Sequence, residues 1–70
     1  MTQFNHQDIN TLASHACHHA LLAHRAYVSK EAARLAANEA LDIVEALHSE
    51  QVFKQVANQA GQLMKSNDLL

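Results

Sequence analysis

Proline and tryptophan are absent from this chain of 70 residues, and glycine and cysteine each occur only once. The residues that most often interrupt helices are therefore almost missing. A single cysteine cannot form a disulfide within the chain and is typical of proteins from a reducing compartment. Because only three residues are aromatic, any hydrophobic core must consist mainly of alanine, leucine, isoleucine and valine.

Basic residues and long hydrophobic runs are also scarce. Five Lys and Arg against seven Asp and Glu give a formal net charge of −2, which is unsuited to a protein that grips phosphate backbones. No apolar run approaches the length of a membrane span, and the first ten residues lack the basic and apolar regions of a signal peptide. We therefore expect a cytoplasmic protein that binds no membrane and for which nucleic acid is the least favoured partner.

The residues that are abundant favour helices. Thirteen are alanine, and leucine and glutamine are also common, which is typical of an all-α protein. Alanine-rich faces bury little area each, and 70 residues are near the lower limit for a stable core. We expect a single helical domain over 1–70, with frayed ends at 1–4 and 67–70, that gains stability from a homodimer or a larger partner.

Apolar residues recur at spacings of three and four along three stretches, as on one face of an amphipathic helix. The first stretch contains Ile9, Leu12, Ala13, Ala16, Ala20, Ala23 and Tyr27. The second contains Ala33, Ala36, Ala37, Ala40, Ile43, Val44 and Leu47, and the third contains Val52, Phe53, Val56, Ala57, Ala60, Leu63 and Met64. Asn5 and Ser29 are suitable N-caps for the first two, and Phe4 is placed to form a hydrophobic staple with Ile9.

The direction of the apolar face reverses twice, near Val28–Ser29 and near His48–Glu50. These reversals indicate turns. We predict an all-α bundle of three helices, over about 6–27, 30–48 and 50–66. A second set of apolar residues continues at helical spacing through His48, however, and this pattern favours the alternative of a two-helix hairpin with one long helix over 29–66.

Four of the six histidines fall in the segment SHACHHALLAHR. His15 and His19 are one helical turn apart with His18 beside them, an arrangement that can bind zinc or another transition metal if a second subunit or a partner completes the ligand set. All three lie opposite the apolar face, so the alternatives are a surface that responds to protonation, a partner contact, or solvated side chains. Full protonation of the six histidines would raise the net charge by six, to +4.

No combination of residues indicates catalysis. Cys17 and His24 lie on one side of the first predicted helix, but two helical turns separate them by about 10 Å, which is beyond hydrogen-bond reach. We interpret Cys17 as a small buried side chain and His24 as a residue at the edge of the apolar face. We predict that the protein is not an enzyme and requires no cofactor.

Leu22 lies on the histidine face, where a solvated helix normally carries a polar residue, and is a candidate centre of an interface. A main buried seam, with a second subunit or a partner, is predicted from Leu41, Val44, Val52, Phe53, Val56 and Leu63. Our leading hypothesis is a small regulator that binds and modulates a larger protein, as inhibitors, antiactivators and co-chaperones do. It would act as a homodimer or a small subunit, through helix-in-groove packing.

The segment VSKEAARLAA, Val28–Ala37, resembles the opening of a helix-turn-helix of the excisionase or MerR type. The resemblance implies a DNA-binding unit, but it covers only these ten residues. Asn38–Ile43 continue an acidic helix where that family has a turn and a basic recognition helix. We carry no functional residue over, and we rank a nucleic-acid-binding regulator behind the interaction protein and the metal- or pH-responsive protein.

Overall fold

The structure, a computed structural model, describes residues 6–69, and of His6 only the backbone. The described residues contain no strand. They form three helices: α1 (His6–Tyr27), α2 (Lys30–Leu47) and α3 (Glu50–Ser66). The prediction of an all-α bundle of three helices is thereby confirmed. The predicted cap Asn5, and the ends 1–4 and 70 that we expected to fray, lie outside the described residues.

Two serines determine where α2 and α3 begin. The Ser29 hydroxyl accepts a hydrogen bond from the backbone N–H of Ala32 at 3.2 Å, as the sequence predicted. The Ser49 hydroxyl accepts one from the backbone N–H of Val52, also at 3.2 Å. Each bond satisfies an N–H group in the first turn that has no partner within its own helix.

One long helix over 29–66, the alternative that the sequence also favoured, is wrong. His48 and Ser49 both have extended backbone conformations, and the chain turns between α2 and α3. If α2 and α3 formed one continuous helix, the apolar face around Val56 would point nearly opposite to the apolar face of α2. The break at His48 and Ser49 allows both faces to pack on the same side of α1.

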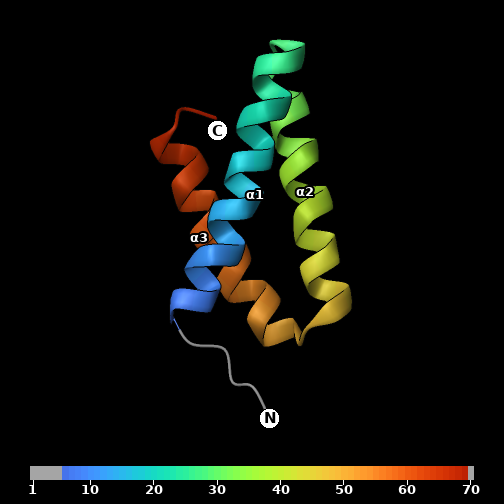
Figure 1. The fold of residues 1–70 in the computed structure, drawn as a ribbon, viewed down its shortest axis with the longest axis vertical. Helices are drawn as coiled ribbons and strands as arrows, with labels where there is room; N and C mark the ends of the chain where they lie inside the picture. Colours follow the sequence, from blue (N-terminus) through green and yellow to red (C-terminus); the bar gives the residue numbers. More distant parts are fainter. Residues whose placement is uncertain (1–5, 70) are drawn as a thin grey trace.

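The helix α1 is the centre of the bundle. It lies antiparallel beside α2, and α3 turns back from the end of α2 and crosses α1 (Figure 1). The helix α1 packs extensively against both neighbours, whereas α2 and α3 contact each other least. The described part of the molecule is therefore elongated, with principal extents of 41 × 21 × 14 Å.

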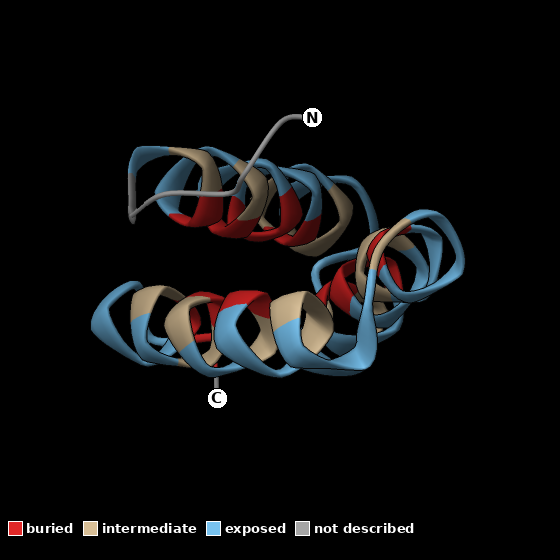
Figure 2. Cartoon of the chain, turned by 90° about the horizontal axis from the view of Figure 1, so that it is seen from below, coloured by how far each residue is buried: buried red, intermediate tan, exposed pale blue. Residues whose placement is uncertain are grey.

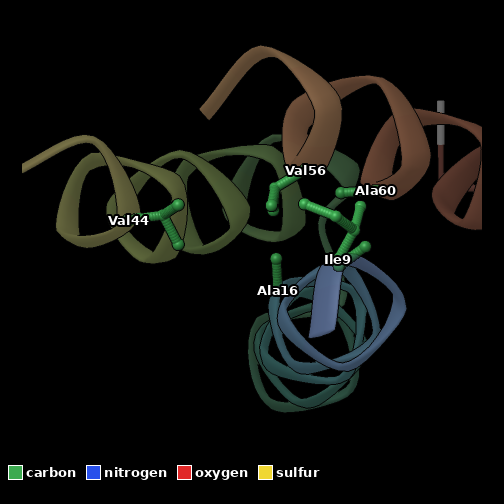
Figure 3. Packing of buried hydrophobic residues seen from close by; sticks show 6 residues of the cluster. Ile9, Ala16, Val44, Val56 and Ala60 are labelled. Atoms are coloured by element: carbon green, nitrogen blue, oxygen red, sulfur yellow. The ribbon is translucent and has the colours of Figure 1, made fainter. Parts of the chain in front are cut away.

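The core consists mostly of small side chains. Each helix turns its buried residues toward its neighbours and leaves its outer face exposed (Figure 2). In one cluster Ile9 of α1, Val44 of α2 and Val56 of α3 point toward a common interior (Figure 3). Among the described residues, seven of the thirteen buried apolar residues are alanine, and Val56 is the largest side chain that is fully buried. Such a core removes little apolar surface from water per residue.

Residues 67–69, which we expected to fray, form backbone hydrogen bonds with the last turn of α3. The backbone N–H of Leu69 donates to the carbonyl of Met64 at 2.8 Å, and that of Asp68 donates to the carbonyl of Lys65 at 3.1 Å. With Asp68 in the left-handed conformation at a φ of 60°, these bonds form a Schellman motif, which commonly packs an apolar residue back against the helix. Leu69 accordingly packs with Met64 in the second core cluster, with 3% of its surface exposed.

Three residues that the apolar pattern assigned to buried faces are exposed instead: Tyr27, Ile43 and Leu47. Spacing indicates the direction of an apolar face but not how much of that face a neighbouring helix covers. Because α3 contacts α2 only slightly, the edges of the α2 face remain open to solvent. Within residues 6–69, no helix is both long enough and apolar enough to span a membrane.

Candidate functional site

A groove follows the seam between α1 and α2. Alanine lets two helices approach closely, because the distance between helix axes depends on the side chains at the contact. The groove is lined at this seam by Ala23 of α1 and by Ala32, Ala36 and Ala40 of α2. Larger side chains on both helices extend beyond this alanine floor and form the walls.

The groove has two parts, which meet at His19 and Glu39 because these residues line both. One part, with a volume of about 460 Å³, is bordered by Leu22 of α1 and Leu35 of α2. The other part, with a volume of about 250 Å³, is bordered by Ile43 of α2. Among the described residues that line the two parts, none belongs to α3. We call this surface the α1–α2 groove.

Three aliphatic side chains in the walls of the α1–α2 groove are open to solvent. The exposed fractions of Leu22, Leu35 and Ile43 are 47%, 54% and 60%. Single exposed leucines are ordinary, but here three large aliphatic side chains border one groove, with Leu22 and Leu35 on one side of the junction and Ile43 on the other. The sequence proposed Leu22 as the centre of an interface, and the structure places it in the wall of this groove opposite residues of α2.

The histidines of α1 do not gather into one site. His15 and His19 line the α1–α2 groove beside Glu39, whereas His18 is exposed and does not line it. Over residues 6–69, no three His, Cys, Asp or Glu side chains are arranged to hold one metal ion. The hypothesis of a metal site at His15, His18 and His19 therefore gains no support from the geometry of this chain.

The predicted seam residues lie mainly inside one chain. Val44 and Val56 are buried in the first core cluster, and Leu41, Val52 and Leu63 pack against it while partly buried. These five residues join the helices of a single molecule, because α3 folds back and supplies the contacts that we had assigned to a second subunit or a partner.

Phe53, the sixth residue of the predicted seam, is half-buried near the start of α3 and belongs to neither core cluster. It is therefore not a central contact of the core. Of the six residues of the predicted seam, only Val44 lines the α1–α2 groove.

No protein-family model, curated protein or solved structure matches this chain. Its function is therefore inferred from its own surface.

Cys17 lies under the C-terminal residues. Its thiol is buried in the second core cluster with Leu69, and its sulfur accepts a contact from the side-chain amide of Asn67 at 3.7 Å. The same amide donates a hydrogen bond to the carbonyl of Leu63 at 2.7 Å. The burial of Cys17 agrees with the interpretation from sequence, and its contacts are those of a side chain held in a core.

The α2 wall of the groove was not identified from the sequence. Glu39 was not singled out, and Ile43 was assigned to the buried face. A usable signal was present, because Leu35, Glu39 and Ile43 follow one another at intervals of four and so share one face of α2. Pairing that face with the one that carries Leu22 required knowledge of how α1 and α2 meet.

Proposed function

We propose that this protein is a small non-enzymatic interaction module that binds a helix of a larger protein in its α1–α2 groove and thereby modulates that protein. The observation that carries the proposal is the row of exposed aliphatic side chains, Leu22, Leu35 and Ile43, over an alanine floor between two helices. In this role the chain is either a small subunit of a complex or a homodimer that opens to receive its target.

A helix is the form of partner that suits such a groove. Two antiparallel helices with small side chains between them leave a channel in which the apolar stripe of a third helix can lie, with anchors at intervals of three and four residues. Leu22 and Leu35 border one part of the channel and Ile43 the other, so that a helix along it contacts all three. The small core supports the same proposal, because burying these side chains adds stability that the chain alone lacks.

The proposal is tested by capture from a lysate of the source cells with three tagged proteins: the wild type, Leu35→Glu, and Leu47→Glu as the matched control. Leu47 is on the same helix and is 72% exposed, but it does not line the groove. We expect the wild type and Leu47→Glu to recover the same protein in stoichiometric amount. We expect Leu35→Glu to recover at least about tenfold less, because a buried carboxylate without a partner opposes binding.

The recovered protein is then purified, and its dissociation constants for the three variants are measured by calorimetry. Equal affinity for Leu35→Glu and the wild type would show that the partner does not use the groove. Capture is repeated with zinc and with a chelator. Recovery that requires zinc would favour the metal-responsive hypothesis instead.

A further inference from the structure

We propose that a second copy of this chain occupies the α1–α2 groove when no other partner fills it, so that the resting form is a two-fold symmetric homodimer. The proposal rests on the function proposed for the groove and adds a consequence. Because one groove cannot hold both occupants, a larger partner binds only as the dimer opens. Three observations carry the inference: the exposed apolar walls, the register of the two helices, and the distribution of charge along them.

The register follows from the residues that line the groove. The helices α1 and α2 run antiparallel (Figure 1), and His19 and Glu39 occupy the junction of both parts of the groove. Between this junction and the α1–α2 turn, Leu22 of α1 and Leu35 of α2 lie at the same height along the helix axes. Leu22 and Leu35 thus stand at matching levels, as His19 and Glu39 do, whereas Ile43 of α2 stands level with His15 of α1.

Near the junction the two helices differ in their ionisable side chains. Between residues 11 and 20 those of α1 are three histidines, His15, His18 and His19, beside the buried Cys17. Between residues 38 and 47 those of α2 are all acidic: Glu39, Asp42 and Glu45. The groove therefore has one wall that carries His15 and His19 and another that carries Glu39.

Two copies can face each other through this groove about two kinds of two-fold axis. An axis across the helices places α1 on α1 and α2 on α2, which brings Glu39 near its own copy and histidines near histidines. An axis along the helices places α1 of each copy on α2 of the other. Only the second arrangement pairs His19 with Glu39 of the partner subunit, whose carboxylate can accept a hydrogen bond from the imidazole N–H, so polar complementarity selects it.

The selected arrangement also matches the apolar pair at Leu22 and Leu35. An axis along the helices preserves the levels, and Leu22 of each copy meets Leu35 of the partner subunit. Both contacts occur twice because the interface is self-complementary. The four helices then run antiparallel to their neighbours, and the dimer buries the aliphatic side chains that a single chain leaves exposed.

The first measurement is the mass of the purified chain by sedimentation equilibrium, at concentrations up to about 1 mM. We expect twice the chain mass of 7.7 kDa. Leu22→Glu and Leu35→Glu are each expected to raise the dissociation constant about a hundredfold or more, because symmetry places each substitution in the interface twice. Leu47→Glu should change the dissociation constant less than about threefold. A wild-type monomer throughout, or equal effects of all three substitutions, would overturn the proposal.

The pairing of α1 with α2 is tested by exchanging charge. His19→Glu and Glu39→Lys are each expected to weaken the dimer about tenfold, because the first places like charges opposite each other and the second removes the carboxylate that accepts from the imidazole. The double variant restores opposite charges both within the chain and across the interface, and should dimerise within about threefold of the wild type. A double variant as weak as the single variants would overturn the crosswise arrangement. Circular dichroism verifies that each variant is helical.

The two proposals fail separately. A monomeric wild type that still captures a partner through Leu35 would overturn the resting dimer and leave the interaction module intact. A dimer with the expected variant effects that captures no protein would support the resting dimer and argue against the function proposed for the groove. If both hold, the purified partner should lower the fraction of dimer as its concentration rises.

Discussion

Val28 is held in a backbone conformation that its side chain disfavours. It has a φ of 49° and is 85% exposed, so no buried contact compensates for the crowding of a β-branched side chain in the left-handed region. We expect Val28→Gly to raise the free energy of unfolding by about 1 kcal/mol, measured by chemical denaturation. Val28→Ala keeps a Cβ at the same φ and should change stability much less. Equal stability of all three proteins would show that the position is unstrained.

Asp68 is the other described non-glycine residue with a positive φ, and its situation is different. Aspartate tolerates the left-handed region better than valine does, because its short polar side chain can form local hydrogen bonds. The Schellman motif requires that conformation at this position, and the motif places Leu69 in the core. The strained residue Val28 lies in the turn between α1 and α2. The left-handed conformation of Asp68 instead ends α3 and places the side chain of Leu69 in the core.

At the scale of the helix, Gly61 weakens α3. It lies within Glu50–Ser66, and a Cβ added there would meet no atom within 4 Å. Glycine costs about 1 kcal/mol relative to alanine in a helix interior, so Gly61→Ala should raise the free energy of unfolding by about that amount. Thermal and urea denaturation measure the change, and Gln62→Ala on the exposed neighbour is the control with little expected effect. A loss of stability would mean that the position is more crowded than the structure indicates.

The boundaries of the helices were largely readable from the sequence. Ser29 caps α2 as predicted, and the reversals of the apolar face marked both turns. The choice between two turns and one long helix was not readable, because apolar residues also continue through His48 at helical spacing. That choice is made by packing, since α3 must fold back for Val56 to reach α1.

The C-terminal residues and the groove were less predictable, for different reasons. Leu69 belongs to no periodic stripe, and the signal for its burial is the preceding Asn67 and Asp68, which suit a left-handed helix end. The groove depends on which edges of α1 and α2 stay uncovered. A single helix pattern contains no such information, so Leu22 was noticed as an exception while Ile43 was assigned to the core.

At the scale of the whole molecule, one side of α1 is covered and another is open. The helix α3 and the residues that follow it cover the buried side, where Cys17 and Ala20 pack with Met64 and Leu69. The α1–α2 groove lies elsewhere and has no wall from α3. Binding in the groove therefore needs no rearrangement of α3. Substitutions in the C-terminal residues should lower the stability of the protein without weakening binding in the groove.

Leu69→Ala tests that separation. Because Leu69 is 3% exposed over the cluster that holds Cys17, its truncation should lower the free energy of unfolding by about 2 kcal/mol. The C-terminal residues then open more often, and the rate at which a thiol reagent modifies Cys17 should rise about tenfold or more under native conditions. Lys65→Ala, at an exposed position one turn earlier, is the control. Unchanged reactivity of Cys17 in Leu69→Ala would mean that other residues protect the thiol, and weakened capture of a partner would mean that the groove and the C-terminal residues are coupled.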